Sequence, residues 1–347
     1  MSLSRLQGFR IAGISTCVPP DVVDNQSLAD TYGATDVRKV VSMAGVRFRH
    51  VVQPGVTATD LCIQAAQQLM ATLGWEADSV SGLILVTQSP DYFLPSSACI
   101  AHARLGLGVH CAAFDVGLGC SGYPYGLYIA GTMLKGGGHR RILMLHGETP
   151  SRFASPDDAG TTLLFGDAGS ATALEWTDDA ADEASFGLYT DGTGADALIM
   201  RGGAFRDPQP ADPRDRHVFM DGAAIFNFTI KRVPAMIEET LAFAGKGVAD
   251  IDKFVFNQTN RFIMKHLMKK FELSDDRVPM TIEETGNCGG PSVAVTVTKA
   301  LGMPRDRELT LMLLGYGVGL SWSAAIVRLR ADVPLIHSVL GGEPVQA

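Results

Sequence analysis

Cys120 is the residue of this chain whose type and setting most clearly allow chemistry. It lies in the run 114–130, where a strand-like stretch meets glycines and then a helical pattern. A thiol at the first turn of a helix feels the positive end of the helix macrodipole and unpaired backbone amides, which both favour the nucleophilic thiolate. Gly117, Gly119 and Gly122 permit a tight turn that a substrate can approach closely. We predict a nucleophile at Cys120; the alternative is a small buried core residue, the commonest role of a free cysteine.

The length and composition limit what surrounds this cysteine. A chain of 347 residues fits two domains or one large duplicated α/β unit. Its net charge of -8 is spread without long runs, so we expect neither a nucleic acid nor an anionic membrane as a partner. The chain has no apolar stretch of about 18 residues and no signal-peptide pattern, which predicts a cytoplasmic protein. Six irregularly spaced cysteines without a C-x-x-C pair predict reduced thiols and no metal site.

Two distant parts of the chain follow one plan, in which an amphipathic helix, an acidic connection, a buried strand and a polar turn succeed one another. In the first half, segment 60–70 is followed by 77–88, and this pair matches 233–243 followed by 249–259 in the second half. Further along the chain, 141–148 matches 308–317. Apolar strands alternating with helices of period 3.6 predict two α/β halves with buried, largely parallel sheets, and chance similarity is the alternative. An acidic stretch at 175–185 places the join, so we expect halves 1–176 and 177–347. The polar stretch 201–215 is interpreted as a surface excursion.

Several motifs in order now suggest a family. They are Asp91-Tyr-Phe-Leu-Pro-Ser-Ser-Ala-Cys, the Cys120 turn, Leu164-Phe-Gly-Asp-Ala-Gly-Ser-Ala, Met220-Asp-Gly-Ala-Ala-Ile-Phe, Asn257-Gln-Thr-Asn, Gly286-Asn-Cys-Gly-Gly and Gly315-Tyr-Gly-Val-Gly-Leu-Ser-Trp. Over nearly its whole length the chain resembles the thiolase superfamily, and within it β-ketoacyl-acyl carrier protein synthase III. The resemblance implies a duplicated α/β thiolase-like fold, layered α-β-α-β-α, with two mixed, mostly parallel sheets.

The resemblance also implies a reaction. The cysteine would take an acyl group from a thioester and pass it to a carbanion formed by decarboxylating a malonyl thioester, for fatty-acid or specialised acyl and polyketide synthesis. Covalent catalysis of this kind divides one hard acyl transfer into two easier steps. The developing oxyanion needs fixed donors, and the matching backbone amides are those of Cys120 and Val318. An ordinary turn between strands is the alternative for the glycine-rich loop around Val318.

One position departs from the family pattern of Cys-His-Asn. Asn257 stands where the family has its histidine, whereas Asn287 matches the family asparagine, so the site would be Cys120, Asn257 and Asn287. An asparagine amide can donate a hydrogen bond to the malonyl thioester oxygen, but it has no titratable proton. Losing one such donor typically costs on the order of a hundred- to a thousandfold in rate. We therefore expect acylation to be better preserved than decarboxylation.

Other side chains could replace the missing histidine. His146 and Glu148 end a predicted strand, where such folds place chemistry, and His217 precedes the Met-Asp-Gly motif. The alternative for each is a surface or packing residue. Cys288 could add a second thiol near the site or be a small core residue.

The acyl donor is a second departure. Relatives primed by coenzyme A hold its adenine between a tryptophan and an arginine, and the aligned residues here are Lys39 and Ala159; Met43 replaces a further arginine. Without a stacking surface and a phosphate partner, coenzyme A loses its main anchors. We predict an acyl-carrier-protein donor, or a coenzyme A ester held differently, with Asn260 contacting the phosphopantetheine arm.

The family further implies a homodimer in which the turn before Pro-Ser-x-Ala-Cys lines the partner's acyl pocket. Leu94 is the matching residue and Phe93 is its neighbour; a core position for Leu94 is the alternative. No cofactor is predicted beyond the thioester substrates. Two other functions stay open: acyl transfer from Cys120 to an oxygen or nitrogen nucleophile without decarboxylation, and a non-catalytic synthase subunit.

Overall fold

Two large β-sheets with helices between and outside them make up the protein. The computed structural model describes residues 2–302, 305–342 and 345–346. The seven-stranded sheet has the order β16-β15-β2-β8-β7-β5-β6, and the five-stranded sheet has the order β1-β9-β14-β13-β12. The strands of the larger sheet are β2 (Phe9–Val18), β5 (Gly82–Val86), β6 (Ala112–Val116), β7 (Arg141–Glu148), β8 (Ala168–Trp176), β15 (Leu335–Val339) and β16 (Val345–Gln346). Those of the smaller sheet are β1 (Leu3–Gln7), β9 (Glu183–Thr190), β12 (Lys253–Phe256), β13 (Leu309–Gly317) and β14 (Ser321–Leu329).

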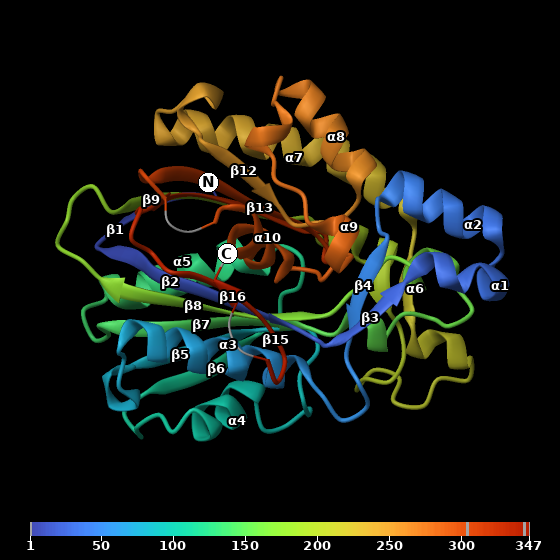
Figure 1. Ribbon diagram of the computed structural model, residues 1–347, viewed down its shortest axis with the longest axis horizontal. Coiled ribbons are helices and arrows are strands. Elements are labelled where there is room, and N and C mark those ends of the chain that lie inside the picture. The colour runs from blue at the N-terminus through green and yellow to red at the C-terminus, as the bar shows by residue number, and fades with distance from the viewer. Residues whose placement is uncertain (1, 303–304, 343–344, 347) are drawn as a thin grey trace.

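Helices form three layers around these sheets, as Figure 1 shows. Between the sheets lie α5 (Gly122–Lys135) and α10 (Ser292–Ala300), which are buried by apolar side chains of both sheets. The outer face of the larger sheet is covered by α3 (Ala58–Leu73) and α4 (Ser97–Arg104), and that of the smaller sheet by α7 (Gly222–Ala244) and α8 (Arg261–Lys270). The order of layers is therefore α-β-α-β-α, as predicted.

Short strands and short helices lie outside the two large sheets. Two short antiparallel pairs join β3 to β4 and β10 to β11. Their bounds, with those of the short helices, are β3 (Asp21–Asp24), β4 (Phe48–Val51), β10 (Leu198–Met200), β11 (Val218–Met220), α1 (Ala29–Tyr32), α2 (Ala34–Lys39), α6 (Ala159–Thr162) and α9 (Ile282–Thr285). The polar stretch 201–215 lies between β10 and β11, and Phe205 within it is 83% exposed, as a surface excursion requires.

The repeat inferred from the sequence is a repeat of topology. In the first half, β5 pairs parallel with β7, β7 antiparallel with β8, and β8 antiparallel with β2. In the second half, β12, β13, β14 and β9 pair in the same directions and order. The outer helix α3 corresponds to α7 and the central helix α5 to α10. A division at residue 176 stays a prediction, because β1 pairs with β9 and β15 pairs with β2, so each chain end joins the other half's sheet.

The expectation that the sheets are mostly parallel is wrong. Among the described strands of the two large sheets, six pairings are antiparallel and four are parallel. Helices cover both faces of each sheet, so antiparallel strands such as β8 and β14 are as fully buried as parallel ones. Continuous apolar runs therefore indicated burial on both faces and not strand direction.

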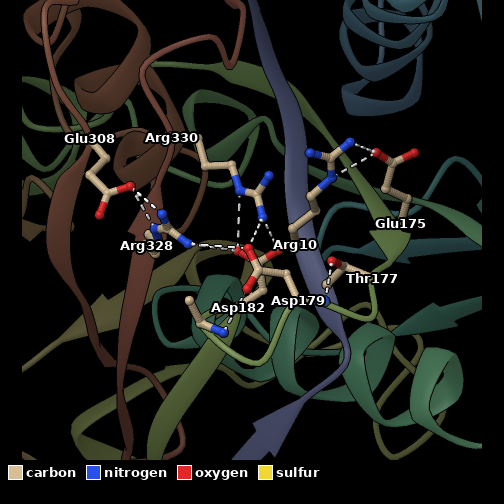
Figure 2. A network of polar contacts seen from close by, with 9 residues as sticks. Arg10, Glu175, Thr177, Asp179, Asp182, Glu308, Arg328 and Arg330 are labelled. Carbon is tan, nitrogen blue, oxygen red and sulfur yellow. Dashed lines mark hydrogen bonds and ion pairs between the residues drawn. The ribbon is translucent and has the colours of Figure 1, made fainter.

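The acidic stretch near 180 connects the two sheets from β8 to β9 and pairs with arginines of β14 and the residue after it (Figure 2). The side chain of Asp182 is only 3% exposed, and its Oδ2 accepts a hydrogen bond of 2.6 Å from Arg330. Arg330 also binds Asp179 at 2.7 Å. Arg328 lies 3.6 Å from Asp182 and donates to Glu308. These contacts hold the connection between β8 and β9 against the smaller sheet.

Candidate active site

Cys120 lies in the turn between β6 and α5, as the sequence predicted. The turn is tight, because the backbone amide of Gly122 donates to the carbonyl oxygen of Gly119 at 2.8 Å. Helix α5 begins at Gly122 with Ser121 as its N-cap, so Cys120 is placed at the positive end of a 14-residue helix. Its side chain is half-buried.

Cys120 opens onto a cavity of about 210 Å³ that is mostly apolar. Strand β10, Val218 of β11, and aromatic side chains of the loops after β7 supply most of the wall. The lining residues are Gln88, Gly119, Cys120, Glu148, Pro150, Phe153, Phe165, Leu198, Ile199, Met200, Val218, Gly289 and Val318. Such a cavity suits an apolar group attached to the sulfur, because apolar walls favour burying hydrocarbon.

The glycine-rich turn between β13 and β14 passes directly beside the sulfur. A Cβ atom on Gly317 would lie 2.9 Å from both Cβ and Sγ of Cys120, which only glycine avoids. Ser321 Oγ donates to the Val318 carbonyl at 2.8 Å and lies 2.6 Å from Ser121 Oγ. These contacts tie the turn to the start of α5. The backbone amides of Val318 and Cys120 both lie close enough to the sulfur to stabilise its negative charge. Their role as an oxyanion hole stays a prediction.

The thiol of Cys120 is nevertheless protonated at neutral pH. Burial raises its pKa to about 11, and the carboxylate of Glu148 raises the pKa further, while the backbone amides of Val318 and Cys120 oppose the shift. The expectation that the helix N-terminus makes this cysteine a ready thiolate is therefore outweighed by burial. A group that accepts the proton is needed before the sulfur can attack a thioester.

Asn257 and Asn287 lie near this turn, each bound to its own surroundings. Asn257 follows β12 and is fully buried; its Oδ1 accepts from the Tyr316 amide at 3.2 Å, and its Nδ2 lies 3.5 Å from the Tyr316 carbonyl. Asn287 is 5% exposed, and its Oδ1 accepts from the Gly289 amide at 2.9 Å. In the part of the chain that the structure describes, neither side chain hydrogen-bonds to Cys120 or lines the cavity wall. Their catalytic roles stay predictions.

The residues predicted to contact substrate lie away from the cavity. Asn260 is the N-cap of α8, and its Oδ1 accepts from the Phe262 amide at 2.8 Å. Phe93 and Leu94 are 68% and 79% exposed, so the alternative of a core position for Leu94 is wrong in the single chain. The ring of Phe93 lies 5.1 Å from that of Phe205, between centroids.

The candidates for replacing the missing histidine have different surroundings. Glu148, the last residue of β7, lines the cavity together with Cys120. His146 is fully buried beneath the turn, its ring stacks on Tyr123 at 6.3 Å, and neither ring nitrogen has a hydrogen-bond partner among the described residues. Burial lowers the pKa of His146 to about 3, so the ring is neutral. His217 is half-buried outside the cavity, and Cys288 is a core residue.

The positions that match the coenzyme A anchors of the family are exposed or partly exposed. Lys39 is exposed at the end of α2, and Met43 is 49% exposed on the π-helical turn Val40–Ala44 beside α8. Ala159 begins the short helix α6. None of these three side chains offers an aromatic face or a guanidinium group, as the sequence indicated.

Sequence reasoning missed most of the cavity wall. Leu198, Ile199 and Met200 belong to a three-residue strand before the polar stretch, and Val218 follows it. Such short segments carry no periodic pattern. Only the apolar residues on both sides of the polar stretch, in 198–200 and 218–220, could have suggested that two short strands pair there. Residues 2–302, 305–342 and 345–346 hold no group of three or more His, Cys, Asp or Glu placed for a metal ion. Across the same ranges, no helix is long and apolar enough to cross a bilayer.

Comparison with known proteins assigns the family. Residues 114–192 match the profile of 3-oxoacyl-[acyl-carrier-protein (ACP)] synthase III, and residues 241–329 match the profile of the C-terminal part of that family. The chain is 29% identical to the β-ketoacyl-[acyl-carrier-protein] synthase III of Chlamydia caviae over 333 residues, which cover 94% of this chain and 99% of the relative.

Solved structures agree. The 3-oxoacyl-(acyl-carrier protein) synthase of Burkholderia xenovorans LB400 is 39% identical with a TM-score of 0.93, over 97% of this chain and 98% of that one. A 3-oxoacyl-(acyl-carrier-protein) synthase III is 37% identical with a TM-score of 0.87, over 93% of this chain and all of that one. The duplicated layers and the similarity along the whole chain identify this protein as a member of the 3-oxoacyl-acyl-carrier-protein synthase III family, with the thiolase fold.

Proposed function

We propose that the chain is an acyltransferase that loads an acyl group from a thioester onto Cys120 and condenses it with a malonyl-type thioester, in fatty-acid or specialised acyl or polyketide synthesis. The observation that carries the proposal is Cys120 itself. Its sulfur opens onto an apolar cavity of about 210 Å³ and lies beside the amides of Cys120 and Val318. Few roles other than covalent acyl transfer need a thiol, an apolar cavity and two converging amides together.

In the first half-reaction, the Cys120 sulfur attacks the donor's thioester carbonyl and the two amides hold the oxyanion. Collapse of the tetrahedral intermediate releases the donor thiol and leaves the acyl chain in the apolar cavity. In the second, decarboxylation of the malonyl group releases carbon dioxide and yields a carbanion that attacks the acyl-Cys120 carbonyl. Collapse of this tetrahedral intermediate breaks the bond to Cys120, frees its sulfur and releases the β-keto thioester. Asn257 and Asn287 would donate hydrogen bonds to the malonyl thioester oxygen through their amides.

A second function is favoured by the bonding of Asn257. Its amide is held at the Tyr316 backbone, and it cannot carry a proton. Decarboxylation would then be slow, and acyl-Cys120 could pass its acyl group to an oxygen or nitrogen nucleophile. The first half-reaction is the same in both functions.

One experiment separates these functions. Intact-protein mass spectrometry would follow the protein and its Cys120→Ala variant with a panel of acyl thioesters and then with malonyl-acyl carrier protein. We expect an acyl adduct on wild type only, followed by its loss with a β-keto thioester and carbon dioxide. An adduct that persists favours transfer without decarboxylation. Absence of any adduct would overturn both functions in favour of a non-catalytic subunit.

We also propose acyl carrier protein as the partner that brings the acyl donor. The exposed Lys39 and Met43 and the short side chain of Ala159 leave adenine without a stacking surface. Adduct formation should therefore be faster from acyl-carrier-protein thioesters than from coenzyme A esters of the same chain. Equal rates and half-saturation concentrations for both donors would contradict this.

A homodimer is supported by the exposed apolar side chains near Pro95. Phe93, Leu94 and Phe205 are all more than two-thirds exposed, and such a cluster commonly marks an interface. Leu94→Asp should convert a dimer to monomers in light scattering, whereas a wild type that is already monomeric would remove the role proposed for Leu94. The six free cysteines suit a reducing compartment, so we infer a cytoplasmic enzyme, acting without a cofactor.

A further inference from the structure

The predicted site lacks a proton acceptor for the reaction that it would perform. Cys120 is half-buried and its thiol is protonated at neutral pH, and Asn257 and Asn287 cannot take up its proton. Forming a carbon–sulfur bond from a thiol requires that its proton leave during the attack. A group on the cavity wall must therefore be able to accept it.

Glu148 is the one titratable side chain besides Cys120 on the described wall of the cavity. The remaining lining residues are Gln88 and residues with apolar or no side chains. His146 is two residues earlier on β7, but its ring lies beneath the turn, outside the cavity lining. The geometry thus leaves a single carboxyl group facing the space that the reacting atoms occupy.

Two hydrogen bonds fix the orientation of the Glu148 carboxyl group. Its Oε1 accepts from the Gln88 backbone amide at 2.8 Å, and its Oε2 accepts from Ser89 Oγ at 2.6 Å. Ser89 Oγ in turn accepts from the Thr149 amide at 3.2 Å. Each carboxylate oxygen has two lone pairs, so one on each oxygen remains for a proton. The two hydrogen bonds therefore fix the carboxyl group and still leave it able to accept a proton.

The surroundings of Glu148 suit a group that exchanges protons near neutrality. Burial raises the pKa of Glu148 to about 7, and the charge of Asp167 adds to the rise, while the bonds from Ser89 and Gln88 oppose it. The other ionisable groups facing it are Cys120, a thiol, and the neutral His146. Behind β7, Cys62 of α3 is a buried thiol whose pKa is raised. A base works best when its pKa is close to the working pH.

On this geometry, and resting on the proposed acylation of Cys120, we propose that Glu148 accepts the thiol proton of Cys120 and returns it to the leaving group. The proton passes from Sγ to the carboxylate, directly or through one water, as Sγ bonds to the thioester carbonyl carbon. When the tetrahedral intermediate collapses, the bond from that carbon to the donor sulfur breaks, and the donor thiolate takes the proton from Glu148. No oxidant, reductant or further reactant is required.

A purely structural carboxyl group makes different predictions for Glu148→Gln. Glutamine can keep the bond from the Gln88 amide through its Oε1 and can replace the bond from Ser89 by a reversed one, in which its Nε2 donates to Ser89 Oγ, but it cannot take a proton. If Glu148 only holds the 88–89 loop, the variant keeps its activity. Removing a negative charge near Cys120 would even ease ionisation of the thiol and increase its reactivity.

The test measures Cys120 with and without a substrate. Iodoacetamide alkylation of Cys120, read by mass spectrometry from about pH 5 to about pH 9, needs no acyl donor and so does not depend on the proposed function. We expect Glu148→Gln to lower the alkylation rate at pH 8 and to abolish an inflection near pH 7 that Glu148→Asp retains. Single-turnover acylation should fall about 100-fold in Glu148→Gln.

A matched control and the contrary outcome complete the design. Asp167 is a fully buried carboxyl group that accepts bonds from Ser151 and Val52 but does not line the cavity. Because its charge contributes to the raised pKa of Glu148, Asp167→Asn should keep the alkylation inflection and move it to lower pH. Thermal melting checks that each variant is folded; if Glu148→Gln is not, Glu148→Asp decides by its inflection. Faster or unchanged alkylation in Glu148→Gln, or no inflection near pH 7 in wild type and Glu148→Asp, would overturn the proposal. Normal alkylation behaviour without acylation would instead count against the proposed function.

Discussion

Gly290 packs directly against the His146 ring beneath the Cys120 turn, and Gly290→Ala should disrupt this packing. A Cβ on Gly290 would lie 1.9 Å from Cε1 and 2.4 Å from Nε2 of His146, and 2.6 Å from the carbonyl oxygen of Gly119. The imidazole cannot move aside easily, because a Cβ on Gly122 would already lie 3.0 Å from it and Tyr123 stacks on it. Ring and carbonyl thus confine the new methyl group from two sides.

The magnitude follows from packing. Inserting a methyl group into a filled core costs about 1 to 3 kcal/mol and occasionally more, and contacts this short place Gly290→Ala at about 3 kcal/mol. Replacing His146 by alanine removes a large buried ring but also two ring nitrogens that have no hydrogen-bond partner among the residues that the structure describes, so we expect a smaller net cost, of about 1 to 2 kcal/mol. In the double variant the methyl group occupies space that the ring has left. The double variant should therefore be destabilised by about 2 kcal/mol less than the sum of the two single variants.

Urea unfolding of wild type, both single variants and the double variant, followed by tryptophan fluorescence, measures this coupling. Gly138→Ala is the matched control, because a Cβ there meets nothing within 4 Å. Additive costs in the cycle, or a cost below about 1 kcal/mol for Gly290→Ala, would refute the reasoning from contact geometry. Because Gly119 precedes Cys120, the single variant should also alkylate at Cys120 at a changed rate.

Three further expectations concern buried polar groups. Asp182→Ala should lower the free energy of unfolding by about 1 to 2 kcal/mol, because Arg330 loses a buried partner but keeps Asp179. Asp179→Ala, at a 47% exposed side chain, should cost about 1 kcal/mol or less in the same urea titration. Asn257→Asp should cost about 2 kcal/mol, because an oxygen replaces the amide that faces the Tyr316 carbonyl; a melting temperature equal to wild type would contradict it. The pKa of Glu148 is raised from 4.5 in the unfolded chain to about 7 in the folded protein, so between these pH values the folded protein holds a proton that the unfolded chain has lost. The folded protein therefore loses stability as pH rises through this interval. Glu148→Gln should therefore gain about 1.4 kcal/mol per pH unit relative to wild type between those values, and a pH-independent difference in urea midpoints would exclude the shift.

The sequence predicted what local patterns encode. The turn around Cys120 was predictable because glycines, a strand and a helix adjoin in one short run, and the repeat because helix and strand periods differ. Asn257, Asn287 and Val318 were identified only through resemblance, since nothing local marks them. Strand direction was not predictable, because burial on both faces hides it. The contact between His146 and Gly290 joins positions far apart in the chain, and no periodic pattern reports such a distance.

The register of β7 explains why two titratable side chains gather at this site. Side chains alternate between the faces of a strand, so His146 and Glu148 both face the central layer with α5 and α10, while Gly147 faces α3, where a Cβ would lie 2.5 Å from Cys62 Sγ. Burial favours the neutral form of both groups, so it shifts their pKa values in opposite directions. It lowers the pKa of the imidazole, which stays neutral, and raises the pKa of the carboxyl group, which stays protonated up to about neutral pH. Only the carboxyl group reaches the cavity, so the strand that ends beside Cys120 supplies a proton carrier where Asn257 cannot. Restoring histidine at position 257 should then make Glu148 less necessary, and a smaller effect of Glu148→Gln on acylation in an Asn257→His background than in wild type would measure that dependence.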